Sequence, residues 1–395
     1  MNKNIPLFKV YMSDKASENV KNVLESGFIG QGPIVNEFED KLKEFLNVDY
    51  VVTTNSATSA EHLALHLLKK PSSKRIDFGG IGYVQSDWPG LEQGDEVLTT
   101  ALTCTATNFP ILANGLNIKW VDIDPETLNM DLDDLARKIT KKTKVIFLVH
   151  WGGYPIDLDK VKEIQLTALK NFGFKPVVIE DCAHAFGSKF NGKLIGTHGN
   201  ICTFSFQAIK HLTSVDGGAL ILPHKELFNR AKLLRWYGID RDSDRKDFRC
   251  EADISEWGFK FHMNDVNAII GMTNLEEVKE SVIEKHKSNA KFYDDNLKNV
   301  PGVTLLKRDS RMESSFWIYS LLVDNKEKFA EHMKKHGIMT SQVHERNDIH
   351  SCLADFKSHL PNLDKIKNKL TAIPVGWWVT EDEREYIVNC IKKGW

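Results

Sequence analysis

Residues 204–222 read "FSFQAIKHLTSVDGGALIL" and place a lysine, Lys210, between two apolar runs. Lysines usually lie at the surface, because an ammonium group loses its hydration when it is buried. Burial disfavours the charged form, lowers the pKa of the amine and makes the neutral amine available as a nucleophile. The stretch therefore predicts a strand, a reactive lysine and, after Asp-Gly-Gly, a second strand.

Strand and helix patterns alternate through the N-terminal part of the chain. Residues 35–46 and 59–68 have helical spacing, and Pro33 suits the start of the first helix. Apolar runs typical of buried strands lie at residues 50–54, 95–100, 118–123, 144–150, 176–181, 201–206 and 218–222. Such alternation is typical of an α/β domain, in which a mostly parallel sheet lies between helices.

The pattern changes from about residue 234. We therefore predict a large α/β domain over residues 1–233 and a smaller α+β domain over residues 234–395. Residues 70–93 are longer than a usual helix–strand connection and are expected to form an excursion of the large domain. The smaller domain is predicted from helical runs at 263–297, 326–335 and 381–392 and strand-like runs at 303–306 and 316–323.

Composition and charge restrict the function further. The 395 residues carry a net charge of −2, with 42% hydrophobic and 27% charged residues, as in globular proteins large enough for two domains. The balanced charge argues against nucleic-acid binding, and no apolar run approaches the roughly 20 residues that cross a bilayer. The first residues show no signal peptide, and six scattered cysteines fit neither a disulfide framework nor a metal site. A reducing cytoplasm is the expected location.

Two further stretches add polar groups at the ends of strands. Residues 55–62, "NSATSAEH", follow a strand and open a helix, where free backbone N–H groups and the helix dipole bind anions. Residues 177–188, "VVIEDCAHAFGS", place Asp181 at the carboxyl end of a strand, where open α/β sheets bind ligands, and His184 follows. Ordinary roles also fit both stretches: an N-cap for the first, a capping aspartate and a hydrogen-bonded histidine for the second.

These stretches together supply the parts of a pyridoxal phosphate site: a reactive lysine, a carboxylate for the pyridinium nitrogen and an anion site for the phosphate. The ordered set "NSATSA", "VHWGGYP", "IEDCAHAFGS", "FSFQAIKHLT" and "GFKFHMNDVNAIIG" resembles the DegT/DnrJ/EryC1/StrS sugar aminotransferases over most of the chain. The resemblance implies pyridoxal 5′-phosphate as cofactor. It also implies the fold of fold-type-I enzymes, with a mostly parallel seven-stranded sheet in the large domain.

The resemblance assigns roles residue by residue. It makes Lys210 the Schiff-base lysine and Asp181 the partner of the pyridinium nitrogen. Two positions depart from the family: Cys104 stands where an aromatic residue often stacks on the ring, and Lys260 where an asparagine of the other subunit often reaches the phosphate. The other cofactor contacts that it implies are His184 near the phenolic oxygen, and Ser205, Ala57 and Thr58 at the phosphate.

The activity implied by the resemblance is transamination. An amino group moves from L-glutamate to a nucleotide-linked keto sugar, with a 4-keto-6-deoxy hexose expected, and Lys210 serves as acid and base. The alternatives are a sugar dehydratase of the same family, in which histidine replaces the lysine, and a non-catalytic sensor of the cofactor or the nucleotide sugar. The family spacing from "FSF" falls on Lys210 and not on His211, which favours the transaminase. A homodimer with active sites at the interface is also implied.

The residues that contact the substrate are predicted from chemistry suited to a base, a sugar and a diphosphate. The glycines of "GFIGQGP" permit close backbone approach, although a helix end followed by a turn explains them equally well. Side chains in "RWYGIDRD", "QVHERNDIH" and "VHWGG" suit such a ligand, with surface or core roles as the alternative. The candidates are Gly30, Gln31, Trp151, Arg235, Trp236, His344 and Arg346.

Overall fold

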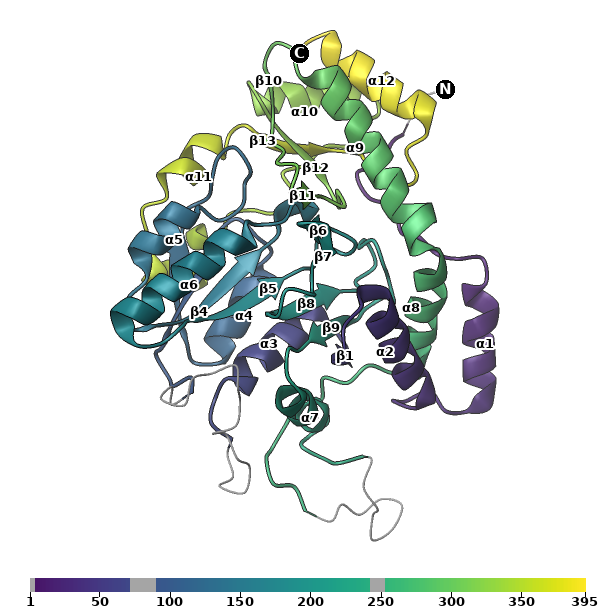
Figure 1. Cartoon of the computed structure of the whole chain (residues 1–395). Helices are drawn as coiled ribbons and strands as arrows, with labels where there is room; N and C mark the ends of the chain where they lie inside the picture. The colour runs from purple at the N-terminus through teal and green to yellow at the C-terminus, as the bar shows by residue number, and fades with distance from the viewer. Residues whose placement is uncertain (1–3, 72–89, 242–252) are drawn as a thin grey trace.

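The chain is built around a central sheet with helices on both faces, and a smaller sheet lies above it in the view of Figure 1. The computed structural model describes residues 4–71, 90–241 and 253–395. Most of the excursion predicted at residues 70–93 lies outside these ranges, so the excursion itself stays a prediction.

The central sheet has seven strands in the order β1-β9-β8-β5-β4-β2-β3. Each neighbouring pair is parallel except the two that involve β9, which runs antiparallel to β1 and to β8. The mostly parallel sheet predicted from the sequence is therefore confirmed. Its strands are β1 (Val51–Thr54), β2 (Glu96–Thr100), β3 (Asn117–Val121), β4 (Thr143–Val149), β5 (Val177–Asp181), β8 (Ile201–Ser205) and β9 (Gly218–Ile221).

Helices cover both faces of the sheet, as the side chains of β4 illustrate. Val145 and Phe147 pack in one core cluster and Ile146 and Leu148 in another, because successive side chains of a strand point to opposite faces. Helices α3, α4 and α7 contribute to the first cluster, and α2, α5, α6 and α8 to the second. The helices of this part are α1 (Ala16–Ser26), α2 (Pro33–Leu46), α3 (Ala57–Leu67), α4 (Thr105–Ala113), α5 (Leu132–Lys138), α6 (Leu158–Phe172), α7 (Lys225–Leu234) and α8 (Asp265–Glu277).

The smaller sheet is antiparallel and has the order β10-β12-β13. It packs with α9, α10 and α12 in a third core cluster, which also contains Ile5 from the N-terminal segment. Helix α8 packs instead against α1 and α2 (Figure 1), and the domain boundary expected after residue 233 stays a prediction. The remaining α-helices and strands of the described residues are β6 (Lys189–Phe190), β7 (Lys193–Leu194), α9 (Glu284–Leu297), β10 (Val303–Leu305), β11 (Met312–Glu313), β12 (Tyr319–Val323), α10 (Lys326–Lys335), α11 (Pro361–Ile366), β13 (Leu370–Ile373) and α12 (Glu381–Lys392).

None of the helices in the described parts of the chain combines the length and the apolar character that a bilayer span requires.

Candidate active site

Lys210 lies in the loop that follows β8, close to acidic and aromatic side chains. Burial lowers the pKa of its amine to about 8, although Asp181, Cys104 and Glu61 each favour the charged form. Its Nζ atom lies 3.5 Å from the ring centroid of Trp317. The amine therefore has the lowered pKa that the apolar runs on either side of it predict, and that a nucleophilic lysine requires.

The loop that carries Lys210 is held by a segment from the C-terminal part of the chain. The Trp317 Nε1–H donates to the carbonyl oxygen of Ile209 at 2.8 Å, and His211 Nε2 lies 3.0 Å from the carbonyl oxygen of Ser315. The ring of His211 packs against that of His286, with centroids 4.7 Å apart. The two neighbouring residues therefore differ in their surroundings. Lys210 lies near Asp181, whereas His211 contacts Ser315 and His286 of the C-terminal part.

Asp181 is the last residue of β5, and both of its carboxylate oxygens accept hydrogen bonds. The Thr107 hydroxyl donates to Oδ2 at 2.7 Å, and the Ala183 backbone N–H donates to Oδ1 at 2.9 Å. Donors of this kind favour the ionised form of a carboxyl group. The side chain is buried, as expected for a carboxylate that faces a ligand at the carboxyl end of a parallel strand.

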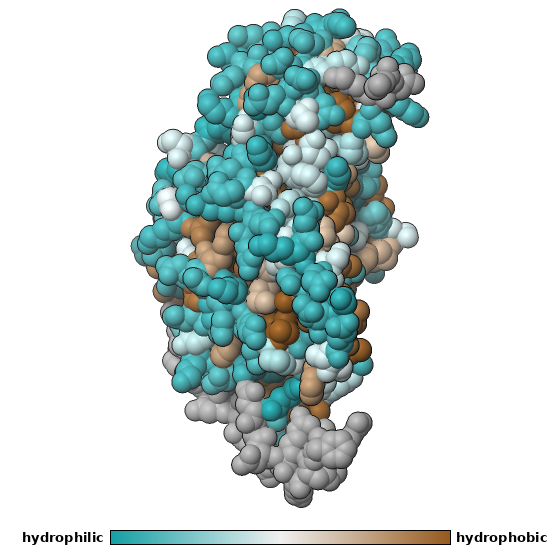
Figure 2. All heavy atoms as spheres, turned by 90° about the vertical axis from the view of Figure 1, so that its right-hand side faces the viewer, coloured by the Kyte–Doolittle hydropathy of each residue, from teal (hydrophilic) through white to brown (hydrophobic). Residues whose placement is uncertain are grey.

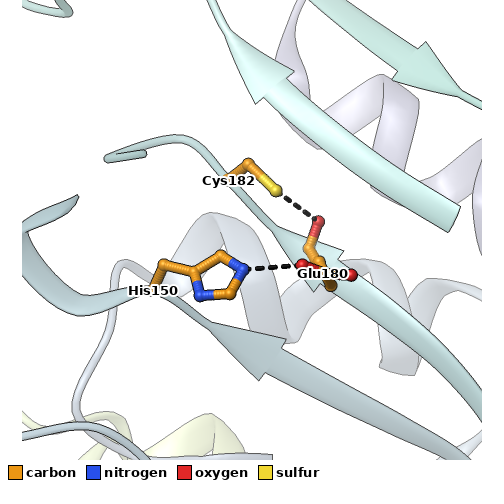
Figure 3. A group of neighbouring side chains, drawn as sticks. All are labelled: His150, Glu180 and Cys182. Atoms are coloured by element: carbon orange, nitrogen blue, oxygen red, sulfur yellow. Dashed lines mark hydrogen bonds and ion pairs between the residues drawn. The ribbon is translucent and has the colours of Figure 1, made fainter. Parts of the chain in front are cut away.

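The preceding residue, Glu180, points to the other face of β5 and belongs to a separate network. Figure 3 shows His150 and Glu180 directed toward one another, with His150 Nε2 2.8 Å from Glu180 Oε2. The Ile156 N–H donates to His150 Nδ1 at 3.1 Å, Asn200 donates to Glu180 Oε1 at 2.6 Å, and the Cys182 thiol donates to the Glu180 carbonyl oxygen. These three side chains have the residue types of a metal site, but protein donors and acceptors already occupy their polar atoms.

His184 stacks within a group of aromatic rings beside Lys210. Its ring lies 3.9 Å from that of Trp317, 5.6 Å from that of His344 and 6.1 Å from that of Trp151, measured between centroids. Burial first, and then the nearby Lys210 ammonium, hold the pKa of His184 well below its usual value, and the same causes lower that of His344 to about 4. Both imidazoles are therefore neutral at physiological pH, and the Nδ1 atom of His184 accepts a hydrogen bond from the Gly152 N–H at 3.4 Å.

The start of α3 lies where an anion site is predicted, at residues 55–62, and Ser56 is the N-cap, its side-chain oxygen accepting from the Ser59 N–H at 3.1 Å; binding of an anion there stays a prediction. Gly218 pairs with Thr54 on one side and with Ser205 on the other, so the two neighbouring strands end together here. A Cβ atom at Gly218 would lie 2.5 Å from the backbone nitrogen of Ala57, so only glycine permits this approach. The backbone N–H groups of Ala57 and Thr58, the first residues of α3, have no acceptor within the helix. Ala57 lies beside Gly218, which is the partner of Ser205 in the sheet.

Lys260 lies beside the start of α3, and Cys104 lies at the start of α4. The Asn55 side chain donates to the Lys260 carbonyl oxygen at 3.3 Å, and Lys260 also forms an isolated bridge with Trp236. The Lys260 side chain is exposed beside the start of α3. Cys104 is the N-cap residue of α4 and lies near Lys210.

Three residues of this site were missed by the reasoning from sequence: Glu61, Thr107 and Trp317. Glu61 and Thr107 face Asp181 from α3 and α4, and Trp317 reaches Lys210 from the C-terminal part. Glu61 had a weak signal, since it is the only acidic residue in the run of residues 57–65, ATSAEHLAL, in which most other residues are small or apolar. Trp317 had none, because its contact partner lies more than one hundred residues earlier in the chain.

Gln31 lies apart from this cluster, in a cleft of about 510 Å³ between α2 and α7. Its carbonyl oxygen accepts a hydrogen bond from Arg241 at 2.9 Å, and Arg241 also lies over the ring of Trp236. Gly30 adjoins this cleft, and its carbonyl oxygen accepts a hydrogen bond from the Asp265 N–H at 2.8 Å. As contacts to a substrate, Gly30, Gln31 and Trp236 stay predictions.

The two arginines predicted to bind substrate have partners within the chain. Arg235 is 1% exposed and its guanidinium pairs with Glu39. Arg346 pairs with Asp348 at 2.6 Å and with Asp364 at 2.5 Å. These ion pairs give both arginines structural roles, so contact with a substrate stays a prediction for them, as it does for Trp151 and His344 in the aromatic group.

Comparison with known proteins agrees with this geometry. The profile of the DegT/DnrJ/EryC1/StrS aminotransferase family matches residues 11–392. The chain belongs to this family. Aminotransferases of the family depend on pyridoxal phosphate, which is therefore the cofactor.

Solved structures and relatives within the family extend the comparison. AtS13 from Actinomadura melliaura is 48% identical, with all of both chains covered and a TM-score of 0.91. The sugar aminotransferase CalS13 from Micromonospora echinospora is 44% identical, with 99% of this chain and 100% of that chain covered and a TM-score of 0.90. GDP-perosamine synthase of Escherichia coli O157:H7 is 32% identical over 86% of this chain and 85% of the relative. The DegT/DnrJ/EryC1/StrS chain described here is accordingly a sugar aminotransferase with the fold of these enzymes.

Proposed function

We propose that the chain transfers the amino group of L-glutamate to the keto carbon of a nucleotide-linked sugar, a 4-keto-6-deoxy hexose. One observation carries the proposal: a lysine of lowered pKa, Lys210, lies beside the doubly hydrogen-bonded carboxylate of Asp181. The start of α3 lies at the same end of the sheet. A lysine, a carboxylate and an anion site are the groups that this cofactor needs.

The residues present fit pyridoxal phosphate. Asp181 would hold the pyridinium nitrogen, and the amides of Ala57 and Thr58 with the hydroxyl of Ser205 would hold the phosphate. Cys104 cannot stack as an aromatic ring does, so we assign the aromatic contacts of the site to the His184–Trp317 pair, whose rings are stacked.

Lys210 is the residue that binds the cofactor and then moves a proton during transfer. When bound, the cofactor supplies an electron sink for the bond changes at the carbon that loses or gains the amino group. A general acid and base works best with a pKa near the operating pH, and the pKa of the Lys210 amine is about 8. The imidazole of His184 is neutral and so adds no second positive charge beside this amine, and because its Nδ1 accepts from the Gly152 N–H at 3.4 Å, its Nε2–H is available as a donor.

The substrate class follows from the relatives together with the family. GDP-perosamine synthase is named for an amino sugar carried by a nucleotide, and CalS13 is named as a sugar aminotransferase. The polar side chains of the cleft between α2 and α7, which include Lys232 and Arg241, suit a ligand with phosphate groups. The base of the nucleotide and the carbon that is aminated are left to experiment.

We further propose that the active form is a homodimer. Phe28 and Ile29, which follow α1, are 74% and 51% exposed, and Leu24 within α1 is 53% exposed. Figure 2 shows apolar residues between hydrophilic ones on the side of the molecule that carries α1. Large exposed apolar side chains that lie together mark interaction surfaces. A second copy of the chain is the partner that the family implies.

The dehydratase alternative is disfavoured by the positions of Lys210 and His211. A dehydratase of this family would present a histidine where the lysine stands. Here the charge of the nearby Asp181 favours the ammonium form of Lys210, while His211 forms a hydrogen bond with the Ser315 carbonyl oxygen. The structure therefore supports a lysine-dependent transaminase.

Reductive trapping tests the cofactor assignment. Borohydride reduction of the protein with pyridoxal phosphate, in which the imine loses one water and then gains two hydrogens, should leave one pyridoxyl phosphate group on the peptide that contains Lys210, and Lys210→Ala should not be labelled. Labelling of the variant at the same level would contradict the assignment. Activity should then be measured with a set of keto-sugar nucleotides and L-glutamate, by the release of 2-oxoglutarate. Cofactor trapping without release from any nucleotide sugar would favour the sensor alternative.

A further inference from the structure

Glu61 is a buried carboxyl group that the proposed reaction does not use. It lies in the first turns of α3, is 1% exposed, and its Oε2 atom is buried without a hydrogen-bond partner among the described residues. Burial of an unpaired carboxylate is costly, so a group in this position is expected to be neutral or to serve a ligand.

The charged groups around Glu61 come from three other elements. Asp181 of β5 lies within hydrogen-bonding reach, Cys104 faces it from the start of α4, and Lys210 faces it from the loop after β8. Burial, followed by the charge of Asp181, raises the pKa of Glu61 well above its usual value, and Lys210 opposes this effect. Two neighbouring buried carboxyl groups do not both ionise at neutral pH, so the pair carries one negative charge.

The donors around Asp181 identify which member of the pair is ionised. Thr107 and the Ala183 N–H donate to Asp181, so both of its oxygens already act as acceptors. The Oε2 atom of Glu61 has no such donor among the described residues. The proton of the pair therefore belongs to Glu61, whose O–H has Asp181 as its acceptor within reach.

We propose that Glu61 is a positioning residue that donates a hydrogen bond from its protonated carboxyl group to Asp181 and so keeps Asp181 ionised. The inference rests on the proposed placement of the pyridinium nitrogen against Asp181. A hydrogen bond from a further donor stabilises the carboxylate form of a carboxyl group, which is the form that holds a pyridinium nitrogen. Cofactor binding then persists further into the acid range than Thr107 and Ala183 alone would permit.

The experiment measures the affinity for pyridoxamine 5′-phosphate as a function of pH. This probe has no aldehyde, so its binding is free of the bond to Lys210, and its own titrations are the same for every variant. Glu61→Leu removes the donor, whereas Glu61→Gln keeps a donor in a group of similar shape. With Glu61→Leu the acid limb of the affinity profile should move up by about one pH unit, a tenfold weaker binding on that limb. With Glu61→Gln the limb should stay near its wild-type position.

Two results would overturn the inference. If both variants move the acid limb to lower pH, Glu61 is ionised in the wild-type protein and repels Asp181. If neither variant moves it, Glu61 only fills space. His66→Gln is the matched control, because His66 lies on the same helix but packs against Trp257 and Phe259.

Asp181→Asn separates failure of this inference from failure of the proposed site. If that variant binds pyridoxamine phosphate as tightly as the wild type at every pH, the placement of the nitrogen at Asp181 is wrong. If it binds weakly while the Glu61 variants shift nothing, the placement stands and only the role of Glu61 is wrong. Thermal unfolding of each variant without cofactor should be measured alongside, so that a loss of fold is recognised.

Discussion

At the scale of single residues, surroundings set the charge of each group in the site. Lys210, His184 and Glu61 are all pushed toward their neutral forms by burial. Asp181 differs because two donors reach its oxygens. The site thus combines one carboxylate with a lysine of intermediate pKa, which is the balance that a nucleophilic amine beside a cationic ring requires.

The pKa of Lys210 makes a prediction about pH. Only the neutral amine attacks an aldehyde, and the pKa of about 8 means that the neutral fraction grows as the pH rises through 8. The rate at which the protein without cofactor takes up pyridoxal phosphate should rise about tenfold per pH unit below 8 and level off above it. Stopped-flow absorbance measures this rate, and Lys210→Ala gives the background. A rate that still rises steeply at pH 10 would mean an ordinary exposed lysine.

At the scale of elements, the active site depends on how strand ends meet the first turn of α3. Gly218 in β9 lies between Thr54 and Ser205, and its lack of a side chain lets Ala57 approach. The "DGG" that follows the lysine loop is therefore explained by close packing of backbone on backbone.

Gly218→Ala should weaken both the fold and the phosphate site. The added Cβ would lie 2.5 Å from the backbone of Ser56 and of Ala57, so the start of α3 must move. We expect a loss of about 1–3 kcal/mol in the free energy of unfolding and a lower affinity for inorganic phosphate. Chemical denaturation and phosphate competition against pyridoxal phosphate measure the two effects. Gly30→Ala, where a Cβ atom would meet nothing within 4 Å, should leave the stability almost unchanged.

The buried pair of Arg235 and Glu39 joins the end of α7 to α2. Arg235→Ala leaves Glu39 as an uncompensated charge in the core, and we expect a loss of about 3–5 kcal/mol in the free energy of unfolding. Arg311→Ala removes an arginine whose ion pairs are partly exposed, and should cost less than about 1 kcal/mol. Urea denaturation compares the two. Equal losses would show that burial does not govern the strength of these pairs.

At the scale of the whole molecule, segments distant in sequence complete the site. The segment of residues 315–317 holds the loop that carries Lys210, and Ile5 near the N-terminus packs in the core of the smaller sheet. The two sheets are therefore connected through the residues that surround the lysine as well as through α8 and α9 (Figure 1).

The apolar surface beside α1 predicts the state of the protein in solution. Light scattering after size exclusion should give twice the mass of one 44.9 kDa chain, and Phe28→Asp should reduce it to that of one chain. Leu166→Asp is the matched control: Leu166 is 45% exposed, but it lies on α6. A monomeric wild-type protein would contradict the proposed homodimer.

Much of this protein was determined by its sequence alone. Continuous apolar runs, alternating with helical patterns, predicted the central sheet and its mostly parallel strands. The reason is that a strand of a parallel sheet is buried on both faces and therefore needs consecutive apolar residues. Lys210, Asp181 and the small residues at the start of α3 also pointed to the cofactor from the sequence alone. Ligands of such sheets bind at the carboxyl ends of strands and at the N-termini of helices, and these residues follow strands or open a helix.

Only the tertiary structure decided which side chains surround these groups. Thr107 donates to Asp181 from a different helix, Trp317 covers Lys210 from far along the chain, and the partner of Arg235 is Glu39. Local periodicity predicts that a residue is buried, but its neighbours depend on how the elements pack. The raised pKa of Glu61 belongs to this second kind of information, because it follows from burial and from the neighbouring Asp181 and not from any pattern in the sequence.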